Sequence, residues 1–311
     1  MFVYIFNIFL LLVEVFQLLL KAAFAVVEAF VYMFIPRAHK SIEGENALIT
    51  GAGHGLGREL ALQLADLGVR LVLWDIDQKA VERTAADVRR KGGVVFAYHC
   101  DVTDEQKVEF VANEVRREVG DVTILINNAG IMHCQTLLCL NDQQIRRTLE
   151  INTLSHFWTV RQFLPRMLEL GHGHIVAIAS IAGILGCANL VDYCASKFGV
   201  VGFMAALAEE VYADRRDHCI HLTTVCPSTM NTRLTHYPRT RFPRLLPILE
   251  VDEVAQRIIN AVLQNQQLLI IPSRIEFITR ITGIFPRKVT QMFQHFLDYA
   301  VDPHEPRPQK C

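Results

Sequence analysis

Tyr193 and Lys197 are four residues apart in the segment DYCASKFGV, and both side chains can take part in proton transfer. On a helix, residues at positions i and i+4 lie on the same face, one turn apart. A tyrosine with an ordinary pKa near ~10 is a poor base, and about 4 kcal/mol of preferential phenolate stabilisation would bring that pKa to ~7. A lysine ammonium one turn away in a partly desolvated cleft favours the phenolate and contributes to such stabilisation. Because such a pair is common by chance, a catalytic role for it also requires a nucleotide site and a hydroxyl partner nearby.

Two further polar residues precede this pair. Ser180 ends the apolar run IVAIAS, thirteen residues before Tyr193. A hydroxyl there could hydrogen-bond a substrate oxygen that exchanges its proton with the tyrosine. Asn152 lies further upstream on a predicted helix. This chemistry requires no metal ion. His172 and His174 are close enough in sequence to be metal ligands, but they are predicted to lie in a loop.

Short apolar runs alternate with polar, periodic segments along most of the chain. The runs are Ala47–Thr50, Leu71–Trp74, Val94–Tyr98, Ile124–Ile126, Ile175–Ala179, Leu222–Val225 and Leu268–Ile271. Alternation of strands and helices is typical of a parallel sheet with helices on both faces. We therefore predict an α/β fold, a Rossmann-type doubly wound parallel sheet of about seven strands, in one catalytic domain spanning residues 44–275.

The first predicted strand runs into the glycine-rich segment TGAGHGLG, which fits the pattern G-x-x-x-G-x-G. Glycines at this spacing allow a tight turn, a close approach of the backbone to a pyrophosphate, and a helix N-terminus aimed at it. The segment predicts a dinucleotide site with contacts from Gly51, Gly55, Leu56 and Gly57.

Residues at the ends of the next strands extend this predicted site. Asp75 ends the second strand, eighteen residues past Gly57. Its carboxylate would accept hydrogen bonds from the ribose hydroxyls and repel a 2′-phosphate, so NAD is favoured over NADP. Because ligands of open α/β sheets bind at the carboxyl ends of strands, we expect further cofactor contacts from Asp101, Val102, Asn128, Ala129 and Gly130.

Residues 1–36 are the most hydrophobic part of the chain, and only Glu14, Lys21 and Glu28 interrupt them with charge. A helix of this length exceeds a hydrocarbon core of ~30 Å. No basic region precedes the stretch and no small-residue cleavage site ends it, so a signal peptide does not fit. We predict a membrane anchor, with the body of the protein kept in the cytosol by the basic residues that follow. The single stripe of charges favours an interfacial or hairpin anchor over a plain span, and all three stay open.

The composition excludes some other classes. A net charge of −1 gives no reason to expect nucleic acid as a partner. The eight cysteines are scattered without the spacing of a zinc site or a disulfide framework, so we expect reduced thiols and no bound metal.

The motifs TGAGHGLG, NNAG and YCASK, together with Asn152 and Ser180 in that order and spacing, resemble the short-chain dehydrogenase/reductase family. The resemblance implies that Tyr193 is the general acid/base and that Lys197 activates it and holds the nicotinamide ribose. It further implies that Ser180 anchors the substrate oxygen and that Asn152 belongs to a proton relay. A homodimer through the helices that carry Asn152 and Tyr193 is implied as well.

Beyond the sixth strand, the resemblance implies cofactor contacts from Pro227 and Thr232 in CPSTMNT. Ser228 stands there in place of the glycine that is usual in the family, which changes the expected backbone geometry but removes no catalytic group.

Longer segments such as LVLWDI and DYCASKFGVVGF resemble the branch with epidermal and photoreceptor-type retinol dehydrogenases and the type 11 and 13 17β-hydroxysteroid dehydrogenases. This resemblance implies a lipophilic alcohol as substrate (retinol, a hydroxysteroid or a long-chain alcohol). It also implies a location on the endoplasmic reticulum membrane or lipid droplets. Residues 233–249 mix arginines with apolar side chains, and residues 276–311 are predicted to form an amphipathic segment and a polar tail; both suit contact with membrane lipid.

Two other functions stay open. An NADPH-dependent retinal or carbonyl reductase would need a basic residue in place of Asp75. A membrane or lipid-droplet scaffold with weak turnover would have no physical reason to keep Asn152, Ser180, Tyr193 and Lys197 at these spacings.

Overall fold

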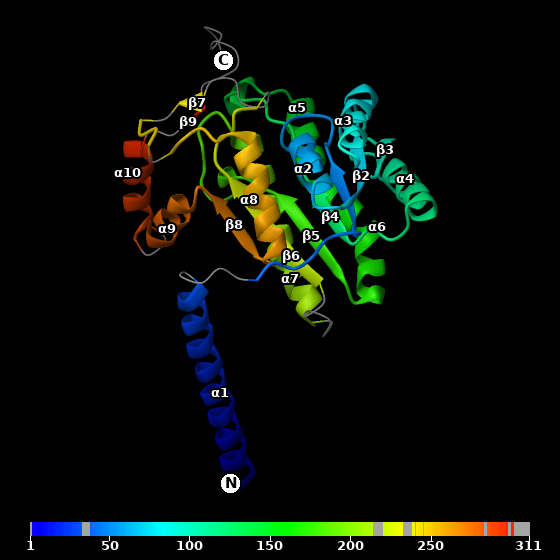
Figure 1. The fold of residues 1–311 in the computed structure, drawn as a ribbon. Coiled ribbons are helices and arrows are strands. Elements are labelled where there is room, and N and C mark those ends of the chain that lie inside the picture. Colours follow the sequence, from blue (N-terminus) through cyan, green and yellow to red (C-terminus); the bar gives the residue numbers. More distant parts are fainter. Residues whose placement is uncertain are drawn as a thin grey trace. The chain divides into compact units, whose positions relative to one another are not determined.

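The computed structural model describes residues 2–32, 38–213, 220–232, 238–239, 241–244, 246–282, 285–297 and 300–301. The chain divides into two compact units, Met1–Lys40 and Ser41–Cys311. The helices, shown in Figure 1, are α1 (Phe2–Tyr32), α2 (Gly55–Ala65), α3 (Gln78–Arg90), α4 (Glu105–Glu118), α5 (Asp142–Leu149), α6 (Ser155–Leu170), α7 (Val191–Ala213), α8 (Val251–Leu263), α9 (Ser273–Thr282) and α10 (Arg287–Leu297).

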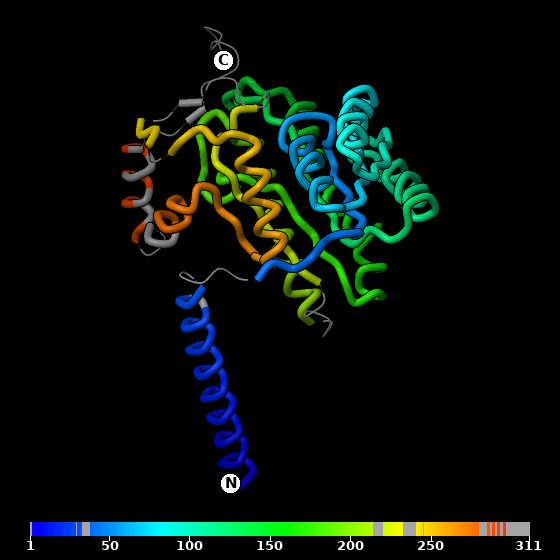
Figure 2. The backbone as a smooth tube through the Cα atoms, viewed as in Figure 1, coloured from blue at the N-terminus to red at the C-terminus, as the bar shows by residue number. Residues whose placement is uncertain are grey.

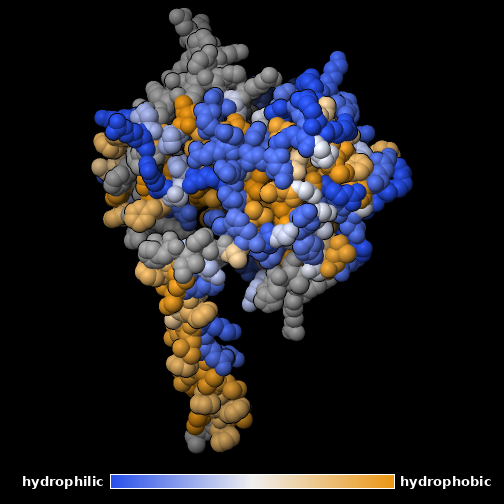
Figure 3. Space-filling view, in the orientation of Figure 1, coloured by the Kyte–Doolittle hydropathy of each residue, from blue (hydrophilic) through white to orange (hydrophobic). Residues whose placement is uncertain are grey.

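Helix α1 forms the first unit and runs unbroken for 31 residues. Its length and composition suffice to cross a membrane. Figure 3 shows an apolar surface interrupted by a short polar patch. Because the helix does not turn back, the hairpin alternative is wrong for these residues. The apolar helix itself confirms the predicted candidate anchor.

The second unit contains a parallel sheet with the strand order β3-β2-β1-β4-β5-β6-β8. The strands are β1 (Asn46–Thr50), β2 (Arg70–Asp75), β3 (Val95–His99), β4 (Ile124–Asn127), β5 (Gly173–Ile178), β6 (Ile220–Pro227) and β8 (Leu268–Ile271). Two short strands, β7 (Pro238–Arg239) and β9 (Ala300–Val301), pair separately and antiparallel. In the tube of Figure 2, the blue segment that begins the sheet lies between the cyan and the yellow-orange segments. The predicted doubly wound sheet is confirmed, and each of the seven apolar runs contributes a strand.

Helices cover both faces of the sheet, and strands contribute side chains to the hydrophobic core on each face. In β2, Leu71 and Leu73 face α2, α3 and α8, whereas Val72 and Trp74 face α4, α6 and α7. Successive side chains of a strand point to opposite faces, so a strand buried on both sides must be apolar throughout. Helices α2 and α8 pack side by side on one face (Figure 1).

Some predictions need correction or fall outside the described residues. His174 lies in β5 and not in a loop, and its Nε2 is 2.8 Å from Thr223 Oγ1. The apolar-basic segment 233–249 is described only at 238–239, 241–244 and 246–249. The domain limits at 44–275 and 276–311 stay predictions.

Candidate active site

One cavity of about 770 Å³ opens at the carboxyl ends of the strands. The cavity brings together most of the predicted site: Gly51, Gly55, Leu56, Asp75, Asp101, Val102, Asn128, Ala129, Gly130, Ser180, Tyr193, Lys197, Pro227 and Thr232 line it. Gly57 and Asn152 are buried and contact lining residues from behind. The order of the strands reverses between β1 and β4, which is where open α/β sheets bind their ligands.

The glycine-rich turn needs its glycines for space. A Cβ on Gly57 would overlap the carbonyl oxygen of Gly51, and one on Gly51 would lie 2.9 Å from the Cα of Ala129. Gly51 and Gly55 also have positive φ, at 65° and 49°, which side chains disfavour. Sequence analysis missed Gly53, whose Cβ would lie 2.9 Å from the carboxylate of Asp75. Its position inside TGAGHGLG is the signal that was available.

The N-terminus of α2 differs from those of its neighbours. Asp77 and Asp104 cap α3 and α4, each accepting a hydrogen bond from a first-turn backbone N–H at 3.0 Å. At α2 the capping position is His54, and within the described residues its side chain caps no N–H group. Helices leave their first N–H groups without internal partners, and an anion can satisfy them. Since His54 also lines the cavity, the end of α2 is suited to a pyrophosphate.

Asp75 is held in place by the backbone. Its Oδ2 accepts the N–H of Gly53 at 2.8 Å, and its Oδ1 accepts the N–H of Asp77 at 2.9 Å. Each carboxylate oxygen keeps capacity for a further donor. The carboxylate therefore suits ribose hydroxyls at this wall of the cavity.

The strand ends beside the turn are tied together by side chains. Asn128 donates to the carbonyl oxygens of Thr50 at 2.9 Å and Gly51 at 3.1 Å, so the end of β4 is fixed to the glycine turn. Asp101 follows β3 and accepts the N–H and the hydroxyl of Thr103. Val102 is buried against the cavity.

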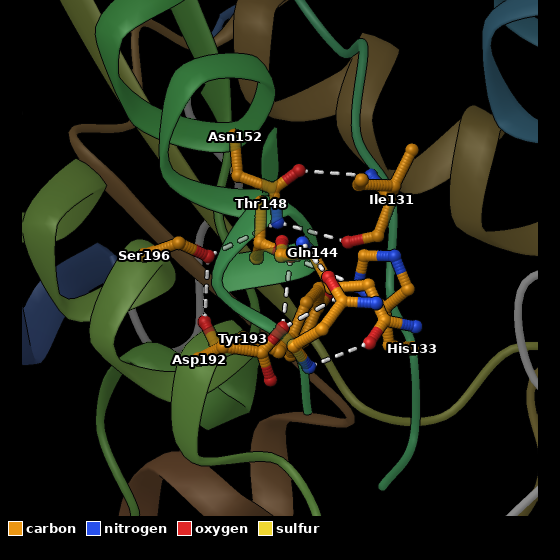
Figure 4. A network of polar contacts seen from close by, with 9 residues as sticks. Ile131, His133, Gln144, Thr148, Asn152, Asp192, Tyr193 and Ser196 are labelled. Atoms are coloured by element: carbon orange, nitrogen blue, oxygen red, sulfur yellow. Dashed lines mark hydrogen bonds and ion pairs between the residues drawn. The ribbon is translucent and has the colours of Figure 1, made fainter. Parts of the chain in front are cut away.

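Asn152 lies in a π-helical turn, η2 (Glu150–Leu154), between α5 and α6. Its Oδ1 accepts the N–H of Ile131 at 2.8 Å, while its Nδ2 donates to the carbonyl of Ile131 at 2.9 Å and to Ser196 Oγ at 3.0 Å. Figure 4 shows this arrangement. Both amide hydrogens are therefore used in holding the loop after β4 against α7.

Lys197 is buried one turn beyond Tyr193 on α7, as predicted. Its Nζ donates to the carbonyl oxygen of Ile178 at 2.8 Å and lies 5.7 Å from the ring centroid of Tyr193. Burial lowers the pKa of the Lys197 ammonium to about 8. A Cβ on Gly130 would lie 3.6 Å from the same Nζ, so a small residue keeps the space beside the ammonium open.

Tyr193 is buried next to Ser180. Burial raises the pKa of the Tyr193 hydroxyl above its usual value, and the hydrogen bond with Ser180 acts in the opposite direction. The predicted lowering of this pKa depends on a nicotinamide cation beside the tyrosine and stays a prediction. Among the chain's own groups, desolvation penalises the phenolate more than its surroundings favour it. Ser180 Oγ accepts the N–H of Ala182 at 3.1 Å, which fixes the hydroxyl at the start of η3 (Ile181–Gly183).

The opposite wall follows β6. Pro227 and Thr232 line the cavity as predicted, and Ser228 does too. The backbone N–H of Ser228 donates to the carbonyl of Ile271 at 2.8 Å, so the serine is accommodated without loss of pairing to the sheet. Several apolar lining residues were not predicted from the sequence, among them Met132, Leu190, Met230 and Val251. Met230 lies inside CPSTMNT, which was the available signal, whereas the other three lie in loops or at a helix end and carry no motif.

This fold and cavity are those of a nucleotide-dependent oxidoreductase, and residues 45–241 match the family described as short chain dehydrogenase. The chain belongs to the short-chain dehydrogenase family, whose members use NAD or NADP. It is 40% identical over 280 residues to 17-beta-hydroxysteroid dehydrogenase 13 of Homo sapiens, covering 90% of this chain and 92% of that one. It is also 40% identical over 285 residues to epidermal retinol dehydrogenase 2 of Homo sapiens, covering 91% and 92%. These relatives confirm the predicted branch.

Among solved structures, the chain resembles a short chain dehydrogenase/reductase from Burkholderia phymatum in complex with NAD. The TM-score is 0.69 at 27% sequence identity, and the match covers 86% of this chain and 99% of that one.

Proposed function

We propose that this protein is an NAD-dependent dehydrogenase that transfers a hydride between a lipophilic alcohol and the nicotinamide, with Tyr193 as general acid/base. The observation that carries the proposal is that Tyr193, Lys197 and Ser180 line the same cavity as the glycine-rich turn. A proton-transfer group and a pyrophosphate cradle in one cavity suit a redox reaction in which a proton and a hydride leave the same alcohol.

The cofactor fits the residues present. The uncapped end of α2 and the glycine turn would hold the pyrophosphate, Asp75 the adenosine ribose, and Lys197 the nicotinamide ribose. The carboxylate of Asp75 opposes a 2′-phosphate. Arg58, a cation that also lines the cavity, is paired with Asp87 at 2.7 Å. NAD is therefore the proposed cofactor, in preference to NADP.

The chain's own side chains handle the proton and hold the alcohol. Ser180 holds the alcohol oxygen, and Tyr193 takes the hydroxyl proton as the C–H bond gives up its hydride. A bound oxidised nicotinamide would supply the hydride acceptor, and its positive charge would lie in the cavity before the transfer. With the ammonium of Lys197, this charge favours the phenolate and opposes the effect of burial on the Tyr193 pKa. The side chain of Asn152 positions the loop at Ile131; a relay role would fall to its backbone, because its amide hydrogens are already used.

A lipophilic substrate suits the rest of the cavity. Met132, Leu190 and Met230 line it, and the first two pack in one apolar cluster with Tyr193. Apolar side chains bind hydrocarbon. The names of the two relatives above refer to a hydroxysteroid and to retinol, both lipophilic alcohols.

Membrane attachment would give the enzyme access to such a substrate. Helix α1 is the proposed anchor at the endoplasmic reticulum membrane or lipid droplets, with the catalytic unit facing the cytosol. Exposed apolar residues on and near α9 and α10 suit contact with lipid: Phe277, Phe285, Met292 and Phe296. Exposed Phe157 on α6 and Phe198 on α7 suit a homodimer through these helices.

The test is NADH formation by the full-length chain in bilayer nanodiscs, with all-trans-retinol, estradiol and a long-chain alcohol as substrates. Tyr193→Phe is the control, since loss of a general base costs roughly 10²- to 10⁴-fold in rate. We expect turnover of at least one alcohol with NAD, and its loss in the control.

Three results would contradict parts of the proposal. Faster turnover with NADPH and the matching aldehyde or ketone would make the enzyme a carbonyl reductase. Turnover that survives Tyr193→Phe would remove the tyrosine from its role. Tight NADH binding with no turnover of any of the alcohols would favour the scaffold function.

A further inference from the structure

A second polar chain lies behind the cavity, beside the one that contains Asn152. His133 Nδ1 is 3.1 Å from Thr148 Oγ1, and Thr148 Oγ1 donates to Asp192 Oδ2 at 2.8 Å. His133 Nδ1 is also 3.5 Å from the same carboxylate oxygen. Figure 4 shows the three side chains meeting between the loop after β4 and the start of α7. None of the three is needed for the chemistry proposed above.

The direction of these hydrogen bonds follows from the groups involved. A threonine hydroxyl has one hydrogen and two lone pairs. Thr148 can give its hydrogen to Asp192 or to the carbonyl of Gln144, which is 2.9 Å away in its own helix. The carboxylate is the stronger acceptor because it is charged. His133 then donates its Nδ1 hydrogen to Thr148, and the chain runs from histidine through threonine to aspartate.

The buried carboxylate of Asp192 needs the hydrogen bond that Thr148 donates. Its side chain is fully buried, and its Oδ1 has no hydrogen-bond partner among the described residues. A buried carboxylate is costly unless donors or charges compensate it. Its place in the first turn of α7 contributes favourably, and Thr148 supplies a direct donor. Asp192 is therefore held where these groups meet, directly before Tyr193 in sequence.

The hydrogen-bonded chain of His133, Thr148 and Asp192 joins three segments whose relative positions shape the site. Ile131 and Met132 line the cavity in the loop that also carries His133. Thr148 lies on α5, and Asp192 begins the helix that carries Tyr193. The Asn152 contacts join the same loop to Ser196, whose Oγ donates to the carbonyl of Tyr193 at 2.7 Å. Two side-chain links thus hold one wall of the cavity to the first turn of α7.

We infer that His133, Thr148 and Asp192 are positioning residues that hold the substrate-side wall in register with Tyr193. This inference rests on the proposed function for its kinetic consequence, but its structural consequence is independent of any substrate. Loss of the link displaces the wall relative to the tyrosine. The reaction step then slows, whereas the cofactor contacts at the glycine turn and Asp75 are unchanged.

The experiment compares Thr148→Val with Thr148→Ser in the full-length chain. Valine keeps the shape and removes the hydroxyl, whereas serine keeps the hydroxyl. We expect kcat to fall on the order of 10- to 100-fold in Thr148→Val, because small displacements in an active site have effects of this size. We expect the Kd of NADH to stay within about twofold, and Thr148→Ser to restore kcat.

Amide hydrogen exchange provides the second readout and needs no substrate. In Thr148→Val, the amides of the loop after β4 and of the first turn of α7 should exchange faster, while those of α2 and α3 stay unchanged. Equal exchange in the valine and serine variants would overturn the inference, as would an unchanged kcat. A wild-type chain without turnover would contradict the proposed function alone, because the exchange comparison still decides the inference.

His133 offers a route if Thr148→Val fails to fold, because its side chain is 23% exposed. His133→Asn places an amide donor near the position of Nδ1, and His133→Leu removes the donor. The same contrast in loop exchange is expected between these two variants. Identical exchange in both would reject the role of the chain.

Discussion

The two ends of the cavity are held in different ways. At the glycine-rich turn, backbone atoms form the wall, and a Cβ on Gly51 or Gly57 would meet the backbone of a neighbouring segment. Around Tyr193, side chains from distant segments hold the wall, as in the contact between Thr148 and Asp192, 44 residues apart. The glycine-rich end, where we propose that the cofactor binds (the cofactor end), is thus sensitive to added atoms. The end around Tyr193, where we propose that catalysis takes place (the catalytic end), is sensitive to lost hydrogen bonds.

This contrast has an energetic counterpart. The glycine-rich turn and the start of α2 form a backbone cradle, which needs only empty space and free N–H groups. These features cost little folding free energy before a ligand binds. The catalytic end buries an ammonium at Lys197 and a carboxylate at Asp192, and buried charges oppose folding. The variants below separate the two ends, because each changes one of them and leaves the other intact.

The largest effect is expected at the cofactor end from Gly57→Ala. The added methyl group would overlap the carbonyl oxygen of Gly51 and lie 2.6 Å from the side-chain nitrogen (Nδ2) of Asn128. Overpacking of this kind costs about 1–3 kcal/mol of stability, and the distorted turn should weaken NADH binding on the order of 100-fold or more. Fluorescence titration with NADH and thermal unfolding measure the two effects.

Gly202→Ala is the matched control for that substitution. An added Cβ there would meet nothing within 4 Å, and the residue lies inside α7. We expect unchanged NADH affinity and a stability gain of up to about 1 kcal/mol, the helix preference of alanine over glycine. Equal NADH affinity in Gly57→Ala and Gly202→Ala would contradict the backbone cradle.

At the catalytic end, Lys197→Met should abolish turnover and yet stabilise the fold at neutral pH. Burial lowers the pKa of Lys197 from 10.5 to about 8, which corresponds to a cost of about 3 kcal/mol for the charged form. Methionine removes this cost and leaves the carbonyl of Ile178 without its donor, a loss of about 1 kcal/mol. The net expectation near pH 7 is a gain of about 2 kcal/mol in the free energy of unfolding.

The pH dependence of this gain has a definite sign. Between pH 8 and 10.5, the unfolded chain keeps the lysine proton and the folded chain does not. The wild-type stability therefore rises with pH in this window, and the advantage of Lys197→Met shrinks and disappears. Urea unfolding at pH 7 and at high pH measures the difference. A variant less stable than wild type at pH 7 would show that the buried ammonium costs less than burial indicates.

The cofactor end could be predicted from the sequence, whereas the catalytic end could be predicted only in part. The strands, the glycine turn, Asp75 and the Tyr193–Lys197 pair depend on local patterns, because a residue's neighbours in the chain decide strand periodicity and helical spacing. The chain of His133, Thr148 and Asp192 joins segments that the sequence does not place together. No local sequence pattern predicts such a contact.

The same limit explains three details that local patterns do not predict. His174 follows Gly173 and the glycine-flanked His172 in the sequence, yet it pairs with β6 as part of β5, and its Nε2 lies 2.8 Å from Thr223 Oγ1. Asn152 lies in a π-helical turn and contacts Ile131 and Ser196, two residues that the sequence does not place beside it. The raised pKa of Tyr193 reflects burial, which depends on the whole fold.

A smaller effect is expected from Asp75→Asn, which tests the preference for NAD. The substitution removes the charge that opposes a 2′-phosphate and keeps one of the two backbone contacts. We expect the ratio of NADPH to NADH affinity to rise on the order of tenfold, or about 1.4 kcal/mol. Asp77→Asn is the matched control, because it makes the same change of charge two residues away at an exposed helix cap. A similar ratio in both variants would make the effect one of net charge and not of Asp75.

The smallest effect is expected at the start of α2, where His54 stands at the capping position without capping. His54→Asp supplies a cap like that of Asp77 and Asp104, so the cofactor-free chain should gain about 0.5–1 kcal/mol. The new carboxylate occupies N–H groups assigned here to the pyrophosphate, so NADH affinity should fall several-fold. Asp104→Ala at α4 should instead lose about 1 kcal/mol and leave NADH affinity unchanged. If His54→Asp stabilises the chain and NADH still binds as in wild type, the pyrophosphate does not use the end of α2, and the backbone cradle reduces to the glycine turn alone.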